Sequence, residues 1–182
     1  MMKLLSEYQQ QLKAEGFEGL GIRPQPHPTQ HKFVGAEACA KCHQDAFDVW
    51  KDSPHGHATD SIVSPPNQRS NIPRHFDPEC LSCHVTGWEP QKFYPYESGF
   101  MSLEKTPFLK HSGCENCHGP GAEHVAAEEP GSKIAVAMRD KLREQMRLPI
   151  EGNVAQRRCT ECHDTDNSPD FKFETYWKQI EH

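Results

Sequence analysis

The sequence is short of the apolar residues that usually form the core of a soluble domain. Only 35% of its 182 residues are hydrophobic, and the mean hydropathy is -0.83. Proline and glycine are plentiful, with 15 and 12 residues. An aliphatic core alone would not offset the conformational entropy that such a chain loses on folding. The chain is therefore either largely disordered or filled by something other than side chains, and its 12 histidines and 8 cysteines favour a bound metal or cofactor.

The sequence also lacks a long apolar run and an excess of basic residues. No stretch approaches the roughly 20 apolar residues that span a bilayer, so we predict no transmembrane segment. The N-terminal stretch MMKLLSEYQQQLKAEG has no long apolar centre of a secretory signal. If the protein is exported, the signal is therefore missing from this chain. The 20 basic and 26 acidic residues give a net charge of -6, and no basic stripe is present, which argues against a nucleic-acid partner.

No cysteine lies outside a single repeated motif. The eight cysteines form four C-x-x-C pairs, and a histidine follows each pair directly. This is the attachment signature of haem c, in which two thiols add to the haem vinyl groups and the histidine binds iron as the proximal ligand. We therefore predict four covalent haem c groups. The motifs, numbered first to fourth along the chain, are Cys39, Cys42 and His43; Cys80, Cys83 and His84; Cys114, Cys117 and His118; and Cys159, Cys162 and His163.

Zinc binding and thiol chemistry are the alternatives for these cysteines. Four C-x-x-C pairs can make two four-cysteine zinc sites or four redox pairs, but neither requires a histidine directly after every pair. A disulfide framework fits poorly, because a bridge within C-x-x-C closes a very short loop. Because a histidine follows every one of the four C-x-x-C pairs, the pattern favours haem.

Four haems would supply the apolar interior that the side chains do not provide. We therefore predict a mainly α fold in which short helices and long loops wrap around the haems, with little or no β structure beyond a short hairpin near residues 85–100. An N-terminal helix and Pro-rich linker would occupy residues 1–34, and the haem domain residues 35–182. The first helix carries Leu5, Tyr8 and Leu12 along one side and ends at Gly16.

Three further helices are predicted within residues 35–182. One covers residues 36–52 and stops before Pro54. A second covers about residues 133–147 after a Ser132 cap, with Ile134, Met138 and Met146 as core residues. The last begins at Ser168-Pro169-Asp170.

Eight histidines remain as candidates for the distal side of the irons. Bis-histidine ligation keeps iron low-spin and its potential comparatively low, whereas a methionine ligand raises it. Met101, Met138 and Met146 are the methionine alternatives, and each is more simply explained by packing. The remaining histidines are His27, His31, His55, His57, His75, His111, His124 and His182.

The motifs and their order resemble the tetrahaem cytochrome c-554 family, whose members are small electron carriers associated with hydroxylamine oxidoreductase in ammonia oxidisers. The resemblance spans roughly residues 35–182 and leaves the first 30 residues without a counterpart. It rests on the stretches CAKCHQDAFDVWKDSPH, CLSCHVTG, GCENCHGPG with a later histidine, CTECH and the final FKFETYWKQIEH.

The resemblance implies distal ligands residue by residue. His124 would serve the haem of the first motif, His55 that of the third and His182 that of the fourth. The second haem, on His84, would be five-coordinate, with an open face that meets small nitrogen oxides. The alternative is a six-coordinate second haem, because another histidine could supply its distal ligand. The candidates are His27, His31, His57, His75 and His111.

The leading functional prediction is electron transfer through four closely packed, mostly bis-histidine haems, with transient redox-protein partners as donor and acceptor. One alternative is a haem enzyme that acts on nitrogen oxides or hydroxylamine at the His84 haem; another is the electron-delivery module of a larger redox protein. No catalytic constellation outside the haems is evident. Because haem c is attached outside the bacterial cytoplasm, we expect a periplasmic or extracellular protein.

Overall fold

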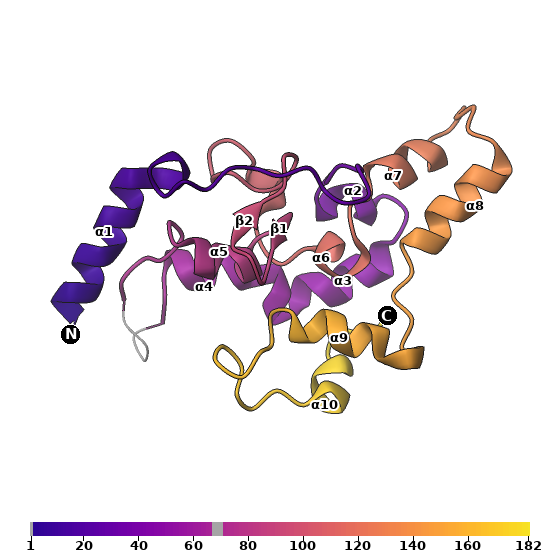
Figure 1. The fold of residues 1–182 in the computed structure, drawn as a ribbon. Coiled ribbons are helices and arrows are strands. Elements are labelled where there is room, and N and C mark those ends of the chain that lie inside the picture. The colour runs from indigo at the N-terminus through magenta and orange to yellow at the C-terminus, as the bar shows by residue number, and fades with distance from the viewer. Residues whose placement is uncertain (1, 67–70) are drawn as a thin grey trace.

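The computed structural model describes residues 2–66 and 71–182. They form short helices joined by long loops, with one small hairpin (Figure 1), which confirms the mainly α prediction. The α-helices are α1 (Met2–Gly19), α2 (Ala36–Ala40), α3 (Gln44–Asp52), α4 (Ala58–Val63), α5 (Pro78–His84), α6 (Cys114–His118), α7 (Ala122–Glu128), α8 (Val136–Gln145), α9 (Val154–Thr160) and α10 (Phe173–Trp177). The 3-10 helices are η1 (Pro54–His57), η2 (Pro107–Leu109) and η3 (Glu151–Asn153).

The side-chain core is small and lies around α5. Asp77 caps this helix by accepting a hydrogen bond from the Glu79 backbone N–H at 3.1 Å, and Pro78 suits the first helical position. The core cluster joins α4, α5, the hairpin and η2 through Phe33, Ile62, Leu81, Val85, Trp88, Tyr96, Phe100 and Leu109. The rest of the chain has far fewer buried apolar side chains, such as Leu142 in α8 and Ala155 in α9, and α10 buries no residue.

The hairpin expected near residues 85–100 is present. Strand β1 (Trp88–Glu89) pairs antiparallel with β2 (Tyr94–Pro95). The Trp88 indole N–H donates to the Phe100 carbonyl at 2.7 Å, which holds the loop after the hairpin against the core.

The prediction of one continuous helix over residues 36–52 is wrong, because this segment forms two helices, α2 and α3. The break falls on the first motif, where the backbone N–H of His43 bonds to the Cys39 carbonyl at 2.9 Å and His43 leaves the helical region (φ -120°, ψ 52°). Hydrophobic periodicity runs through this point, but the motif forms a turn of its own. Helix α3 ends at Asp52, and Ser53 is extended before Pro54, as expected.

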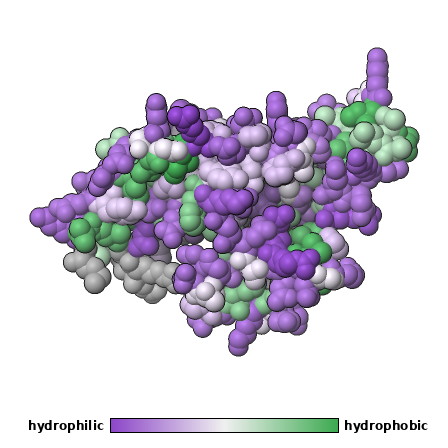
Figure 2. Space-filling model, in the orientation of Figure 1, coloured by the Kyte–Doolittle hydropathy of each residue, from purple (hydrophilic) through white to green (hydrophobic). Residues whose placement is uncertain are grey.

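Helix α8 differs from the expected helix over residues 133–147. It begins at Val136, and its N-cap, Ala135, has no capping side chain. Met138 is 50% exposed, so its expected core role is wrong, and Leu142 is the buried residue instead. Exposed hydrophobic side chains gather on the surface where α8 begins, at the upper right of Figure 2. Helix α10 also begins later than expected, at Phe173.

Helix α1 is longer than expected and packs on the side-chain core. Gly16 does not end it but kinks it, with φ 58° and ψ -175°. The Gln9 amide donates to the Asp77 carboxylate at 2.9 Å, Leu12 is buried, and Phe17 meets Trp88 edge-on at 5.2 Å. Among the described residues, no helix has the length and hydropathy to traverse a bilayer.

Candidate haem-attachment sites

Each attachment motif occupies one helical turn. The second and third motifs lie within α5 and α6, whereas the first and fourth begin in the last turn of α2 and α9 and continue past the helix end. In the first and fourth motifs, the histidine backbone N–H bonds to the carbonyl of the first cysteine at 2.9 Å in both cases. Residues three and four apart share one face of a helical turn. Both thiols and the imidazole of a motif therefore project from the same side.

Thiols of different motifs lie close together. Cys39 donates a hydrogen bond to Cys114, which raises the pKa of Cys39 and lowers that of Cys114. A hydrogen bond from Cys162 lowers the pKa of Cys83 to about 7. Burial, and then the charge of the fourth motif's first cysteine, raise the pKa of Cys117 to about 11. These contacts link the first motif to the third, the third to the fourth, and the fourth to the second.

Three of the motif histidines face a second histidine. Metal–imidazole bonds are about 2 Å long, so two rings that share one metal ion have centres roughly 6 Å apart. The observed separations therefore fit one metal ion between the rings of each pair. The pairs are His43 with His124 (6.4 Å), His118 with His182 (5.9 Å) and His163 with His55 (5.9 Å).

Two of the candidate distal histidines, His55 and His182, each lie beside the motif that the resemblance implies for the other. The resemblance implies His124 for the first motif, and its ring lies 6.4 Å from that of His43. It also implies His55 for the third motif and His182 for the fourth, whereas His55 lies beside the fourth-motif histidine and His182 beside the third. The resemblance gives a ligand's position along the chain, but the packing of the segments decides which of two neighbouring motifs it reaches.

Three of the four proximal imidazoles are held from behind by hydrogen bonds at Nδ1. A histidine that binds a metal through Nε2 usually donates its other ring N–H to a carbonyl, carboxylate or water, which fixes the tautomer and the ring orientation. Sequence reasoning missed these partners, since a backbone carbonyl has no sequence signal and Ser168 is more simply explained as a helix cap. The contacts are His84 Nδ1 with the Ala58 carbonyl (2.8 Å), His118 Nδ1 with the Met146 carbonyl (2.7 Å) and His163 Nδ1 with Ser168 Oγ (3.1 Å).

Burial keeps the candidate ligands in the form that binds metal. Desolvation lowers the pKa of His84, His118, His163, His55 and His124. The imidazoles are therefore neutral at pH 7, with a free nitrogen lone pair. Metal binding needs this deprotonated form.

His84 of the second motif differs from the other three. Within residues 2–66 and 71–182, no histidine ring contacts its ring. Helix α4 holds it on its Nδ1 side, where Ala58 O and Ser61 Oγ approach at 2.8 and 3.2 Å. The buried Thr59 hydroxyl donates to the His84 carbonyl at 2.7 Å and accepts from the His111 backbone N–H at 2.6 Å. The second motif thus has a well-held proximal side and no facing histidine.

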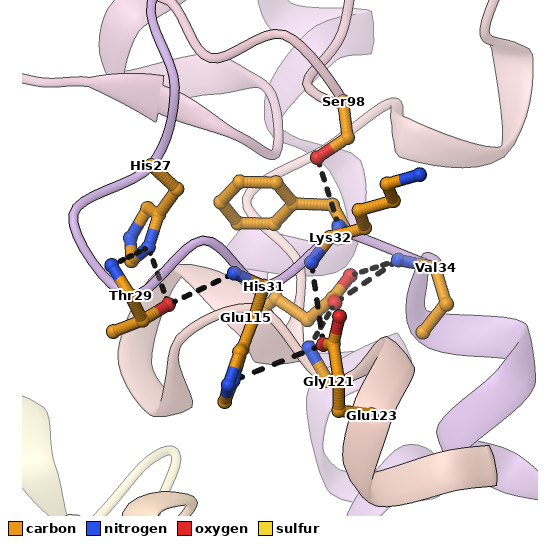
Figure 3. Close-up of polar contacts among 10 residues, drawn as sticks. His27, Thr29, His31, Lys32, Val34, Ser98, Glu115, Gly121 and Glu123 are labelled. Atoms are coloured by element: carbon orange, nitrogen blue, oxygen red, sulfur yellow. Dashed lines mark hydrogen bonds and ion pairs between the residues drawn. The ribbon is translucent and has the colours of Figure 1, made fainter.

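The five other candidate histidines have different neighbours. Figure 3 shows two of them, His27 against Thr29 and His31 beside Glu123. The contacts are His27 Nδ1 with Thr29 Oγ1 (2.8 Å), His31 Nδ1 with Glu123 Oε2 (3.8 Å), the His57 and His111 rings (6.2 Å) and the His75 and Phe76 rings (3.9 Å).

Glu115 is a buried carboxylate inside the third motif that the sequence did not single out. It is 2% exposed and accepts backbone hydrogen bonds from Val34 (3.0 Å), Gly35 (2.7 Å) and Gly121 (2.8 Å). Figure 3 shows those from Val34 and Gly121. It ties the segment before α2 and the turn before α7 to α6. Its position between two motif cysteines carries no signal that separates it from a surface glutamate.

A cavity of about 430 Å³ opens beside the third motif. Pockets that hold cofactors are commonly about 300–1,000 Å³ in volume. Arginine guanidinium groups in its wall suit the anionic propionates of a haem. The lining includes Cys117, His118, His124, Cys162, Arg157 and Arg158.

These residues fit haem better than zinc. A four-cysteine zinc site requires two cysteine pairs to converge. In the part of the chain that the structure describes, no group of three or more cysteine, histidine or acidic side chains converges in a way that holds a metal ion. Paired thiols beside a neutral imidazole are instead the donor set of haem c. The motifs and the facing histidines define a c-type cytochrome.

Comparison with known proteins confirms the resemblance. Residues 38–119 match the family model described as "Cytochrome c554 and c-prime". Cytochrome c-554 of Nitrosomonas europaea is 28% identical over 141 residues, which cover 72% of this chain. The match spans only 57% of that relative's own length.

The fold has a solved counterpart. The reduced state of cytochrome c554 from Nitrosomonas europaea matches with a TM-score of 0.53 and 23% identity, covering 82% of this chain and 83% of that one. At this identity the likeness supports the fold. Covalently bound haem c is the cofactor that the matched family implies.

Proposed function

We propose that the protein transfers electrons through four haem c groups, one on each C-x-x-C-H motif. The observation that carries the proposal is the set of three histidine pairs, whose ring centres lie 5.9–6.4 Å apart. When bound, haem iron supplies reversible one-electron chemistry at each site. The chain's part is to fasten each group by two thioethers and to hold the imidazoles in place.

The ligand assignment follows the pairs. His43 and His124 serve the first haem, and His84 alone serves the second. His118 and His182 serve the third, and His163 and His55 the fourth. The exchange of His55 and His182 relative to the family resemblance is supported by both ring separations of 5.9 Å.

The cysteine contacts between motifs support a connected array. Cys39 meets Cys114, Cys117 is near Cys159, and Cys162 meets Cys83. Haems attached to these cysteines would follow one another in the order of the first, third, fourth and second motifs. An electron that enters at either end therefore has a route through the whole array, and no substrate pocket is required.

A second function is favoured by one observation. His84 has no facing histidine in the described residues, so the second site keeps one position free for a small ligand. A free position separates a reactive metal site from a structural one. Binding or reduction of a small nitrogen oxide at this position is the second candidate function.

The proposal also covers organisation, location and partners. Residues 1–34 form an N-terminal helix and linker, and residues 35–182 form the haem-bearing domain. The protein is periplasmic or extracellular, because haem c attachment takes place outside the bacterial cytoplasm. Its partners are redox proteins that dock transiently through small interfaces.

Two measurements test the proposal. The denatured protein should have the 20.7 kDa polypeptide mass plus four haems, because thioether-bound haem survives denaturation whereas zinc is lost. The electron paramagnetic resonance spectrum of the oxidised protein should contain three low-spin signals and one high-spin signal, and nitric oxide should perturb only the latter. A bare polypeptide mass contradicts the whole proposal, and four low-spin signals contradict the open second site.

Variants test the ligand assignment. His124→Ala should convert one low-spin signal into a second high-spin signal. His57→Ala is the matched control, because His57 is equally a histidine outside the motifs but faces His111, and its spectrum should match wild type. An unchanged spectrum of His124→Ala would exclude this residue as a ligand.

A further inference from the structure

A second cavity, of about 260 Å³, lies between α1 and the loop of residues 100–104. Helix α1 forms one wall with residues that have no counterpart in the family resemblance. The opposite walls come from the segment before α5 and the loop after the hairpin. The lining residues are Leu12, Lys13, Gly16, Phe17, His75, Phe76, Phe100, Met101, Ser102, Leu103 and Glu104.

The lining has an aromatic body and a few polar groups. Phe17, Phe76 and Phe100 contribute three rings, and Lys13 Nζ lies 5.0 Å from the centre of the Phe76 ring. His75 brings an imidazole whose buried Nδ1 has no hydrogen-bond partner among the described residues. A buried nitrogen without a partner costs free energy that a ligand hydroxyl or carbonyl would recover.

We propose that this cavity binds a hydroquinone, a flat aromatic ring with two phenolic hydroxyls, which donates electrons to the haem of the second motif. The inference rests on the proposed electron-transfer function and names its donor. The aromatic walls accept the ring, and His75 and Lys13 offer partners for the ring oxygens. The volume suits a one- or two-ring head group, since small-molecule sites are mostly apolar with a few placed polar groups.

The position of the cavity favours the second motif as acceptor. His75 and Phe76 directly precede Asp77, which caps the helix that carries Cys80 and His84. Helix α1 is fastened to the same Asp77 by Gln9 at 2.9 Å. The second motif also ends the proposed array, so an electron that enters there can reach the other three sites.

The reaction balances with groups in the structure and the haems of the proposed function. The hydroquinone would lose two electrons and two protons to become the quinone, with both O–H bonds broken, and two haems of the proposed function would take up one electron each. One proton passes to the unpartnered His75 Nδ1, and the other to the Glu104 carboxylate, which is exposed and returns it to solvent. Burial lowers the pKa of His75, so this imidazole is neutral and ready to accept a proton.

Binding is tested first without electron transfer. Calorimetric titration of the oxidised holoprotein with a water-soluble naphthoquinone should show one site. Leu12→Trp, which fills the cavity, should weaken binding at least tenfold, whereas Val136→Ala on the exposed start of α8 should leave it unchanged. Equal affinity of Leu12→Trp and wild type would overturn the proposal.

Electron delivery is tested next by stopped-flow reduction with the matching naphthohydroquinone. His75→Phe should reduce at least tenfold more slowly than wild type, while dithionite reduces both at the same rate. Equal rates with the hydroquinone would mean reduction at an exposed haem edge and would overturn the proposal. A protein that dithionite does not reduce would instead contradict the electron-transfer function itself, so the two failures are distinguishable.

Discussion

At the scale of single residues, the buried Glu115 carboxylate connects segments of the chain by hydrogen bonds where few apolar side chains are available to pack. Glu115 joins three segments through backbone hydrogen bonds at 2.7–3.0 Å. Both of its oxygens take part, because Oε1 accepts from Gly121 and Oε2 from Gly35. Only an ionised carboxylate offers two acceptor oxygens in this way.

Glu115→Gln should therefore lower the free energy of unfolding by about 1–3 kcal/mol, the cost of leaving a buried N–H without its acceptor. The amide nitrogen of glutamine would face one of the backbone N–H groups. Urea unfolding of the holoprotein at pH 7 measures the loss. Glu37→Gln is the control, since Glu37 is exposed, and its unfolding should match wild type.

The same residue gives a pH dependence of stability. Burial raises the pKa of Glu115 above its ordinary value, although the backbone hydrogen bonds from Gly121, Gly35 and Val34 oppose this shift. A folded-state pKa above the unfolded value makes a contribution that is present below the unfolded pKa and lost as the pH rises through the folded pKa. The stability of wild type relative to Glu115→Gln, followed by urea unfolding at increasing pH, should thus decrease as the pH rises above 4.5.

At the scale of helices, α1 and α5 depend on one shared side chain. Asp77 caps α5 through one oxygen and accepts the Gln9 amide through the other. The attachment helix of the second motif and the N-terminal helix are thereby fixed to each other. The contact lies between residues 68 positions apart, which hydrophobic periodicity along α1 does not indicate.

Gln9→Ala should lower the unfolding free energy by about 1.5–3 kcal/mol, because it removes a buried hydrogen bond to a charged acceptor. Hydrogen exchange should also become faster in α1. Gln11→Ala is the matched control, since Gln11 bonds only to the exposed Glu15 one turn away on the same helix. Equal destabilisation by both substitutions would show that helix propensity, and not the Asp77 contact, is responsible.

At the scale of the whole molecule, buried side chains are unevenly distributed. The hydrophobic cluster surrounds the second motif, whereas α8 and α9 bury one residue each and α10 buries none. Exposed charge pairs such as Arg143 with Glu128 stabilise this C-terminal region only weakly. The proposed third and fourth haems would supply its interior.

Preventing haem attachment should therefore unfold the C-terminal region selectively. When Cys114, Cys117, Cys159 and Cys162 are replaced by serine, amides in α8, α9 and α10 should lose hydrogen-exchange protection. Amides in α5 and the hairpin should retain more of theirs, because the side-chain core remains. Equal protection of the C-terminal helices in both proteins would mean that they need no cofactor for stability.

The fold could be predicted where local signals are strong. The mainly α class and the hairpin near residues 85–100 are confirmed, because turn residues and apolar positions are local in sequence. The continuous helix over residues 36–52 and the core role of Met138 are wrong. In both cases the signals at the helix ends do not show what happens between them, where the attachment turn breaks the first helix and α8 turns Met138 to the surface.

The sequence by itself determined the attachment chemistry, because two thiols and an imidazole within five consecutive residues fall on one face of a helical turn in any fold. Only the tertiary structure decided which histidines face each other, since His55, His124 and His182 come from segments far from the motifs they meet. It also decided that His84 faces none of them and that α1 forms a cavity beside the second motif. These arrangements arise when distant segments pack, and no local pattern encodes them.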